Sequence, residues 1–487
     1  MRVLYIDLDC CRADHLSING YHRQTDPNLQ RIAAEGLSFR HCYCANSPCV
    51  PSRASLFSGR FGTKNGVVTH HGIGESFRNI WPHGRPRTAP PMLAEHLRRQ
   101  GMKTVTWSSF HERHSAWWFC AGWEQIHTFT RKRGQESADE LTTPFLPWLR
   151  QHGAEDNWFM HVHFWDIHSH YREPEQWGTK FADDPPPDWP DQAAIDSHQE
   201  IYGPRTARDL YTGYKDENKR PISYMPDAIR TEDDFRLLID GYDGAIAYAD
   251  HHVGLILDAL EELGIADETA IIVSGDHGDS FGEHGQYMDH GIANEPVHNI
   301  PMIVKWPGLE ARGTNEAMIY GMDMCPTVCE LLDLPVPEGW DGQSFAPALR
   351  GESFAGWPWQ VWTHGIYTLS RAVRTPEWLL IDMLHPGLYP YEEPYYLHDM
   401  HSDPHQIQNL AAERPEVMDE LLGLLGQWRE EQLEATGLPD PLEQIVPEGP
   451  YLYYDPERMM ERLRATGRGR EAEELRRRLH RYHPGRL

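Results

Sequence analysis

The clearest pattern along the chain is a series of short apolar runs that end in polar residues. Four of these runs cover residues 3–8, 103–108, 158–164 and 269–274, and Asp, Ser or His follows each within a few positions. Runs of this length and composition are typical of strands buried on both faces of a parallel sheet. Since the carboxyl ends of parallel strands meet at one edge of the sheet, the pattern predicts the candidate chemistry there.

Between these strands, hydrophobic spacing and end signals predict helices. The predicted helices cover residues 26–36, 89–100, 231–264 and 323–332. Asp26-Pro27 is a helix start signal, and Gly101 is a stop signal. The alternation of strands and helices predicts an α/β fold, with a mainly parallel sheet covered by helices on both faces.

The rhythm changes twice along the chain. A Pro- and Asp-rich stretch near residues 183–191 interrupts the alternation, and beyond about residue 355 the predicted strands become short, as at 378–381 and 395–397, before a helix at 415–436. Long irregular segments in compact domains are often functional lids. We therefore predict a catalytic domain at 1–355 with a lid or insertion at 173–230, a C-terminal subdomain with a small antiparallel sheet and helix at 356–450, and a basic helical tail at 451–487.

Charge and composition limit the classes of molecule that the protein is expected to bind. The chain of 487 residues has a formal net charge of −28, which argues against nucleic acid or an anionic membrane as a partner. An anionic substrate would therefore need a local cationic pocket. Met1-Arg2 leads directly into the first predicted strand and no apolar run is long enough to span a bilayer, so we expect a cytoplasmic protein. Eight scattered cysteines without a Cys-x-x-Cys pair indicate reduced thiols.

One of these cysteines lies in a specific motif. Cys49-Val-Pro-Ser-Arg53 is followed by a Leu-x-x-Gly-Arg continuation that ends at Arg60. Pro51 can begin a helix, which puts Cys49 at a helix N-terminus where the dipole favours an anion. The motif resembles the signature of the formylglycine-dependent sulfatases, which belong to the alkaline phosphatase superfamily. The resemblance implies an alkaline-phosphatase-like fold and an oxidised Cys49, a formylglycine whose hydrated aldehyde is the nucleophile.

The same resemblance implies a metal site. Sulfatases place a metal-binding Asp three residues before an Arg, as Asp9 precedes Arg12 here, and carry Ser-Asp-His/Asn-Gly where this chain has Asp276-His277-Gly278. The expected ligands are Asp9, Cys49 as formylglycine, Asp276 and His277. Calcium is the family expectation, and a site with fewer carboxylates and one imidazole also suits manganese or magnesium. Many sulfatases have a second Asp after the first, and Cys10 stands at that position.

Three further histidines match family positions, two of them after predicted strands and His290 ten residues before the strand that begins near Ile300. His111 aligns with the histidine of a Gly-Lys-x-His motif, His168 with the second active-site histidine, and His290 with the active-site lysine. The resemblance implies that these residues and Arg53 surround the sulfate. Ser109 stands where a sulfate-binding lysine is expected. We add as possible substrate contacts Ser109, Arg113, Trp165 and Asp7. His161 and His163 lie on one strand face and could equally be core residues.

The predicted activity is hydrolysis of a sulfuric ester of an alcohol or sugar. In the implied mechanism the formylglycine hydrate attacks sulfur and expels the alcohol, and a histidine protonates the leaving group. One alternative is a phosphonate monoester or phosphodiester hydrolase of the same superfamily, whose relatives also lack the second Asp. Another is an inactive binding protein that retains the fold.

Partners follow from these expectations. Abundant tryptophan, 17 residues in all, makes a sugar or oligosaccharide sulfate a plausible substrate. Modification of Cys49 requires a formylglycine-generating or sulfatase-maturating enzyme. The basic tail carries ten Arg against six acidic residues and could dock on an acidic surface of a second copy, giving a homo-oligomer.

Overall fold

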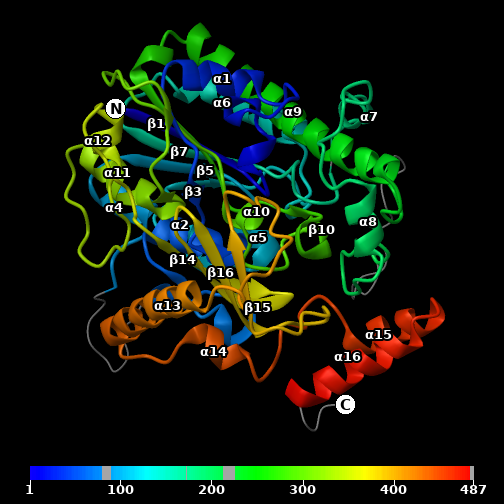
Figure 1. Ribbon diagram of the computed structural model, residues 1–487. Helices are drawn as coiled ribbons and strands as arrows, with labels where there is room; N and C mark the ends of the chain where they lie inside the picture. The colour runs from blue at the N-terminus through cyan, green and yellow to red at the C-terminus, as the bar shows by residue number, and fades with distance from the viewer. Residues whose placement is uncertain (79–88, 172, 212–224, 483–487) are drawn as a thin grey trace.

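The computed structural model describes residues 1–78, 89–171, 173–211 and 225–482, and its centre is an eight-stranded sheet (Figure 1). In sheet order the strands are β12 (Gly313–Asn315), β2 (Leu37–Phe39), β11 (Met302–Lys305), β8 (Thr269–Gly275), β1 (Arg2–Leu8), β7 (Trp158–Phe164), β5 (Lys103–Trp107) and β6 (Gln125–His127). β8, β1, β7, β5 and β6 are all parallel, whereas β11 is antiparallel to both of its neighbours. The predicted mainly parallel sheet is confirmed.

Helices cover both faces of this sheet, as predicted (Figure 1). One layer contains α1 (Pro27–Ala34), α6 (Ala138–His152) and α9 (Glu232–Glu262), and the other contains α2 (Cys49–Ser58), α4 (Leu93–Arg99) and α11 (Met324–Leu331). Alternating side chains of β1 divide between the layers: Leu4 and Ile6 pack in the core under α9, and Val3 and Tyr5 in the core under α2. This alternation follows from the two-residue period of a strand.

The predicted helix at 89–100 is shorter than expected. Within the described residues it begins at Leu93, because Pro90 and Pro91 disfavour helical conformation in the residues before them and Met92 is extended. The predicted helix at 231–264 is present as α9, which begins after Thr231. The Thr231 hydroxyl accepts a hydrogen bond from the backbone of Asp234, and this caps the helix.

A second sheet of five strands lies beside the first. Its order is β17 (Tyr395–Asp399), β16 (Trp378–His385), β15 (Thr368–Arg374), β14 (Gln360–Ile366) and β4 (Asn46–Ser47). Helix α13 (Pro415–Thr436) packs against it, with Leu421, Leu425 and Trp428 in its core. The edge strand β4 comes from the N-terminal half of the chain and ends two residues before Cys49, so the motif cysteine is tied to both sheets.

Short elements complete the fold. They are β3 (Cys42–Tyr43), β9 (Ser280–Phe281), β10 (Tyr287–Asp289), β13 (Ile319–Tyr320), α3 (Gly62–Asn65), α5 (Phe110–His114), α7 (Glu175–Gly178), α8 (Gln192–His198), α10 (Glu295–His298), α12 (Ala346–Leu349), α14 (Pro441–Ile445), α15 (Pro456–Ala465) and α16 (Gly469–Tyr482). The predicted lid includes α7 and α8, and its residues 212–224 lie outside the described part of the chain. No helix among the described residues has the length and apolar character needed to cross a membrane.

The basic tail folds back on its own chain. Arg468 forms an ion pair with Asp209 at 2.6 Å, and Arg478 donates a hydrogen bond to the Tyr202 hydroxyl. Leu475 and Leu479 of α16 are buried in the core that also contains the second sheet. Docking of this tail on a second copy stays a prediction.

Gly365 in the second sheet packs closely against the backbone of Val68, and this contact can be tested by substitution. A Cβ built on Gly365 in β14 would lie 1.6 Å from the Val68 carbonyl oxygen. We expect Gly365→Ala to lower the free energy of unfolding by about 1–3 kcal/mol, measured by urea denaturation, because backbone must move to admit the methyl group. Gly426→Ala in α13 is the matched control, since its Cβ meets nothing within 4 Å and should raise helix stability. Equal stability of the two variants would contradict the predicted clash.

Candidate active site

The candidate site lies where two central strands end. β1 and β8 are parallel neighbours in the register Leu8 to Gly275, so Asp9 and Asp276, the residues that follow, lie side by side. His277 comes next. All three side chains are fully buried. The ends of two neighbouring strands therefore bring together residues that are far apart in the sequence.

Cys49 faces these residues from the first position of α2. The helix begins two residues earlier than Pro51 suggests, and Pro51 is accommodated in the first turn, where its missing N–H leaves no helical bond unmade. The Cys49 sulfur lies 3.1 Å from His277 Nε2. Asp9, Cys49, Asp276 and His277 thus form one buried group, whose potential ligand atoms all lie within 4.8 Å of one another.

Arg53, one turn along α2, lies beneath this group. Its guanidinium contacts Asp276 at 2.6 Å, Asp9 at 3.0 Å and Asp7 at 2.8 Å. It is completely buried and does not line the cavity described below. In this structure Arg53 therefore holds carboxylates in place.

Two histidines form a further layer around the carboxylates. His163 Nε2 lies 3.1 Å from Asp9 and 2.7 Å from Arg53, and His161 Nε2 lies 3.2 Å from Asp7. The sequence left these histidines open between core and function. Their contacts assign them to orienting Asp7 and Asp9, as the outer partners of metal ligands do.

The pKa values show that burial disfavours a second negative charge beside Asp9. Burial raises the pKa of Asp276 to about 8, against the lowering effect of Arg53. Burial also acts to raise the pKa of Asp9, but Arg53 and His163 hold it well below its usual range. One guanidinium shared by three carboxylates does not neutralise them all. Two carboxylates and an imidazole that converge in a buried group are suitable ligands for a divalent cation.

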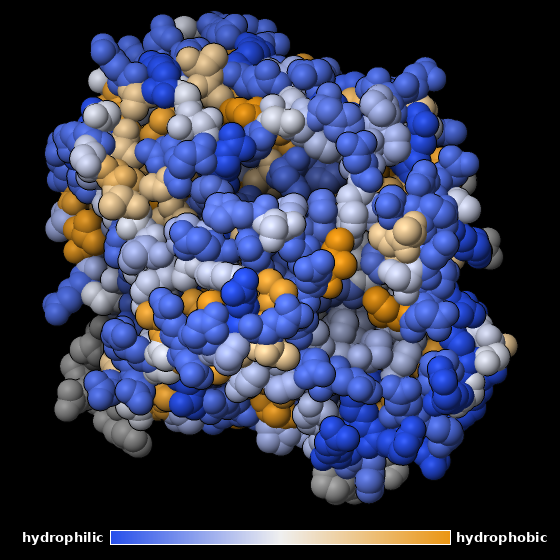
Figure 2. Space-filling model, viewed as in Figure 1, coloured by the Kyte–Doolittle hydropathy of each residue, from blue (hydrophilic) through white to orange (hydrophobic). Residues whose placement is uncertain are grey.

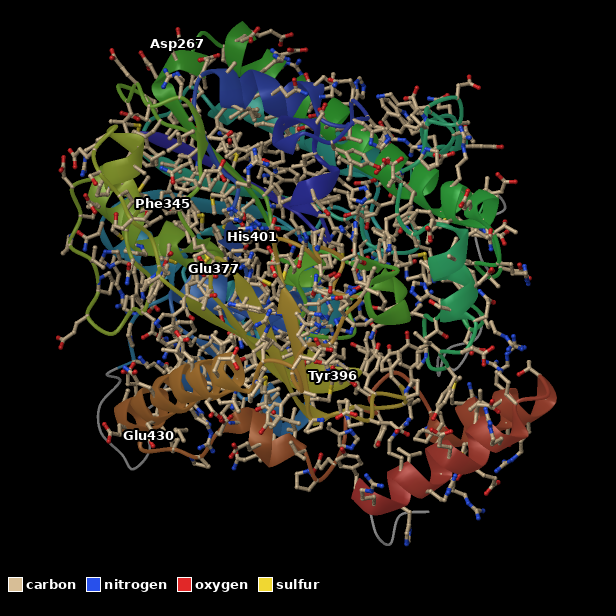
Figure 3. All side chains as sticks on the ribbon, viewed as in Figure 1. Asp267, Phe345, Glu377, Tyr396, His401 and Glu430 are labelled. Carbon is tan, nitrogen blue, oxygen red and sulfur yellow. The ribbon has the colours of Figure 1, made fainter. Side chains whose placement is uncertain are left out.

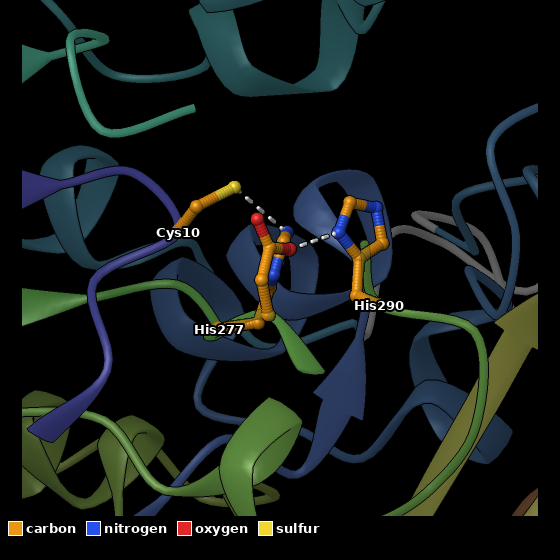
Figure 4. A group of neighbouring side chains, drawn as sticks. Cys10, His277 and His290 are labelled. Atoms are coloured by element: carbon orange, nitrogen blue, oxygen red, sulfur yellow. Dashed lines mark hydrogen bonds and ion pairs between the residues drawn. The ribbon is translucent and has the colours of Figure 1, made fainter. Parts of the chain in front are cut away.

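Cys10 occupies the position of the family's second Asp. Its backbone has φ of 58° in the left-handed region, and its N–H donates to Asp276 Oδ1 at 3.0 Å. Its thiol donates to Asp9 at 3.2 Å and lies 4.0 Å from His277 Nε2 (Figure 4). His290, also in Figure 4, pairs with Asp279 at 2.8 Å. These residues form a second donor group, Cys10, His277, Asp279 and His290, which shares His277 with the first.

A cavity of about 290 Å³ opens above Cys49. Its charged and aromatic lining consists of Arg113, Arg133, Arg205, Asp289, His70, His71, His114, His168, His170, His290, Tyr367 and Tyr453. Three arginines against one carboxylate give this cavity a cationic wall, although the whole protein has a net charge of −28. The cavity is the local cationic pocket that an anionic substrate requires.

The environment of Cys49 favours an anion. Burial acts to raise the pKa of the thiol, but contacts with Cys10, His277, His114 and His168 lower it well below its usual value. Burial lowers the pKa of His114 to about 3 and also lowers that of His168, so both imidazoles are held in the neutral form. Neutral imidazoles can accept or relay a proton.

The structure brings some predicted residues to the cavity and leaves others away from it. His168, His290 and Arg113 line it, and Arg113 also stacks over Trp165 at 5.2 Å. Ser109 instead donates to Glu136 at 2.9 Å. Asp7 and Trp165 are buried below the cavity.

His111 lies outside the lining. It occupies the second position of the short helix α5, and its ring packs against Phe119 and Trp117. His114, at the end of the same helix, reaches Cys49 instead. Moving the Gly-Lys-x-His alignment three positions along the chain places its histidine on His114 but puts Glu112 at the lysine, so the motif gave no reason to choose His114.

The C-terminal half supplies cavity residues that no motif indicated. Tyr453 lines the cavity and its hydroxyl lies 2.9 Å from His70 Nδ1, while Tyr367 stacks near His290. His70 interacts with Cys49 and its pKa is lowered to about 4 by burial. These contacts join residues almost four hundred positions apart, which spacing along the chain cannot predict.

Comparison with known proteins identifies the family. The sulfatase family model matches residues 2–334, and the model of the N-sulphoglucosamine sulphohydrolase C-terminal region matches residues 282–431. An N-acetylglucosamine-6-O-sulfatase of Bacteroides thetaiotaomicron is 23% identical over 520 residues, covering 92% of this chain and 89% of that protein. An arylsulfatase of Clostridium perfringens is 23% identical over 481 residues, covering 87% of this chain and 93% of that protein.

Solved structures share the fold. A protein in complex with its substrate D-glucosamine-2-N,6-O-disulfate superposes with a TM-score of 0.72 at 18% identity, covering 91% of this chain and 99% of the other. A phosphonate monoester hydrolase of Agrobacterium radiobacter gives a TM-score of 0.65 at 20% identity, covering 89% of this chain and 96% of the other. The alkaline-phosphatase-like fold expected from the sequence is confirmed. Because the sulfatase match spans both strand ends and the Cys49 motif, the chain belongs to the sulfatase family and is an enzyme of that family.

Proposed function

We propose that this sulfatase removes sulfate from a sugar sulfate ester, using Cys49 as formylglycine and one divalent metal ion. The observation that carries the proposal is the convergence of Asp9, Asp276 and His277 on Cys49 at the floor of a cationic cavity. A sulfate group entering this cavity would meet positive charge on its walls and the residue at position 49 below it.

The sugar part of the proposal has two supports. A relative that aligns over nearly the whole chain is named for N-acetylglucosamine 6-sulfate, and a protein of the same fold is solved with a disulfated glucosamine. The cavity wall combines Tyr367 and Tyr453 with Arg113 and Arg133. Aromatic rings can pack on the apolar faces of a sugar, and arginines can bind its sulfate groups with paired hydrogen bonds.

Asp9, Asp276 and His277 would hold the metal, together with the oxygens of formylglycine at position 49. A divalent ion bound there supplies positive charge that stabilises a developing negative charge. We propose calcium, the family expectation, with manganese and magnesium as the alternatives that the imidazole ligand leaves open. His161 and His163 orient Asp7 and Asp9, and Arg53 fixes both Asp9 and Asp276.

Formylglycine at position 49 supplies an oxygen nucleophile in the form of its hydrate, and a formylglycine-generating or sulfatase-maturating enzyme would have to produce it. The protein residues bind and move protons around it. His114 and His168 both contact Cys49 and are held neutral, so one can accept a proton from the nucleophile. Arg113, 3.3 Å from His168 Nε2, lies where it can bind a sulfate oxygen.

Phosphonate monoester hydrolysis is the second candidate. It is supported by the match to phosphonate monoester hydrolases, whose fold this chain shares over most of its length. Cys10 in place of a second Asp also leaves the metal group with less negative charge than in many sulfatases. The sulfatase family model and the named relatives favour the sulfate ester.

The proposed function is tested by comparing substrates on modified and unmodified enzyme. Protein produced with a formylglycine-generating enzyme should carry the aldehyde at residue 49 by peptide mass spectrometry and should release sulfate from N-acetylglucosamine 6-sulfate. The same preparation should cleave an aryl sulfate faster than an aryl phosphonate monoester. Activity should rise in proportion to the modified fraction, because only that fraction has the oxygen nucleophile.

Cys49→Ala is the control, and it should be folded but inactive. Full activity in protein whose Cys49 is unmodified would contradict the proposed nucleophile. A faster reaction with the phosphonate would favour the second candidate.

Removal of one metal-ligand candidate should empty the site. Asp276→Asn keeps the shape of the side chain and removes its charge, so we expect metal affinity to fall by at least about 100-fold. Metal content after equilibrium dialysis, measured by mass spectrometry for calcium, manganese and magnesium, checks this. Asp14→Asn is the control, because Asp14 pairs with Arg12 and belongs to neither donor group. Unchanged metal content in Asp276→Asn would show that the metal group is wrongly assigned.

Substitution of two neighbouring histidines tests whether the sequence alignment or the structure identifies the residue that transfers a proton. His114→Gln should lower kcat/KM by about 10²–10⁴-fold, because it removes a group placed for proton transfer beside position 49. His111→Gln should retain most of the activity, since His111 packs outside the cavity. Steady-state kinetics of both variants, with equal formylglycine content, provide the comparison. The reverse order of effects would restore the sequence alignment.

A further inference from the structure

A second cavity, of about 330 Å³, is lined by residues of the same segment, 282–290, that supplies His290 to the first cavity. Three parts of the chain form it: residues 189–201 of the insertion, the turn Gly282–Gly285, and residues 390–409 around β17. Tyr396, which lines it, is labelled in Figure 3 near the end of the second sheet, toward the C-terminal helices. Its volume falls within the usual range for small-molecule sites, about 300–1,000 Å³.

This cavity differs from the first in its charge. Among the described residues that line it, none is Asp, Glu, Lys or Arg. Burial lowers the pKa of His198 to about 4 and that of His284 to about 3, and it also lowers the pKa of His405. These imidazoles are therefore uncharged at neutral pH. A ligand of this cavity gains nothing from carrying a charge and would lose its hydration, so the cavity suits a neutral molecule.

Three residues that line the cavity carry buried polar atoms without a hydrogen-bond partner. His398 is 1% exposed, and its Nε2 makes no hydrogen bond. Its Nδ1 lies 2.8 Å from the Gln408 carbonyl oxygen and 3.5 Å from an Asp403 carboxylate oxygen, so Nδ1 carries a proton, and in the neutral ring Nε2 is an acceptor. Trp189 Nε1 is a buried donor without a partner, and His284 Nε2 is likewise unpaired. Buried groups of this kind cost free energy until a ligand satisfies them.

Flat ring faces complete the lining. Trp189 stacks on His405 with ring centres 4.1 Å apart and nearly parallel planes. Tyr391 and Tyr396, which also line the cavity, are in edge-to-face contact, with ring centres 6.2 Å apart. Such rings offer apolar faces for packing, while the unpaired nitrogens offer one acceptor and one donor at their edges. A sugar ring presents the same combination, with C–H groups on its faces and hydroxyls around its rim.

Among the described residues, the groups of three or more metal-type donors include none of His198, His284, His398 and His405. We therefore consider the imidazole nitrogens of this cavity as hydrogen-bonding groups.

We propose that this second cavity binds one uncharged sugar unit. Stacking on Trp189 would fix the plane of the ring, a sugar hydroxyl would donate to His398 Nε2, and a sugar oxygen would accept from Trp189 Nε1. The cavity adjoins the segment 282–290, which also supplies His290 to the catalytic cavity. The proposal does not depend on the proposed hydrolysis, because binding of an unsulfated sugar requires no chemistry at position 49.

The test uses the full chain with Cys49→Ala, so that no turnover occurs. Unsulfated D-glucose, D-galactose, N-acetyl-D-glucosamine and D-xylose are titrated in turn, and binding is measured by saturation-transfer NMR and calorimetry. At least one should bind with a millimolar dissociation constant. Trp189→Ala and His398→Phe should each weaken that binding about tenfold, because one removes the stacking ring and the other a single acceptor at nearly constant shape.

Two control variants test whether the sugar binds in this cavity and not in the catalytic cavity or on the surface. Trp117→Ala removes a tryptophan that is 69% exposed and should leave binding unchanged. Arg113→Ala alters the catalytic cavity and should also leave it unchanged. The proposal is overturned if none of the four sugars binds, if binding persists undiminished in both Trp189→Ala and His398→Phe, or if Arg113→Ala alone removes it. Circular dichroism of each variant confirms that a loss of binding is not a loss of fold.

Discussion

The guanidinium of Arg53 lies among the carboxylates of Asp7, Asp9 and Asp276, with every one of these side chains excluded from solvent. Through it, helix α2 is joined to the ends of β1 and β8, and the position of residue 49 relative to the strand ends follows from that junction. Removing one partner from a buried ion pair costs about 3–5 kcal/mol, since the other charge remains unpaired. The same junction brings Asp9, Asp276 and His277 within reach of Cys49. The placement of Cys49 and the grouping of these potential metal ligands thus have one physical origin.

The catalytic cavity depends on both sheets. Strand β4 pairs with β14 of the second sheet and ends just before Cys49, so the start of α2 cannot move without the second sheet. That sheet and the segment after it supply Tyr367 and Tyr453, and the Tyr454 hydroxyl donates to Asp289 at 3.0 Å. The floor of the site is made by parallel strand ends, and much of its wall by the C-terminal half. The side of the molecule shown in Figure 2 is largely hydrophilic, and its hydrophobic residues lie in small separate groups.

The residues that sequence reasoning placed well are those fixed by local structure. Asp9, Asp276 and His277 follow buried strands directly, so their position depends only on which strands are neighbours. His111 failed to reach the cavity because the choice between it and His114 depends on where the short helix α5 turns, and a motif with one histidine fits either. His70 and Tyr453 meet only through tertiary packing. Arg53 had a predicted direction, but its burial among three acids, away from the cavity lining, depends on side-chain packing that no motif encodes.

Two cavities with different electrostatic character adjoin the same segment of the chain. Gly282, His284 and Gly285 line a cavity that has no Asp, Glu, Lys or Arg among its described lining residues, and Asp289 and His290 line the cationic cavity above Cys49. The Tyr391 hydroxyl donates a hydrogen bond to the His284 carbonyl and accepts one from the Gln286 side chain. These bonds hold Tyr391 against the segment. A protein with a net charge of −28 repels anions over most of its surface, so the three arginines of the first cavity supply the local positive charge that an anionic substrate would need there. An uncharged sugar needs no such field and can be recognised by ring stacking and hydrogen bonds alone. If both proposals hold, the charged cavity would recognise the sulfate group, while the neutral one would add contact area for a sugar without attracting competing anions.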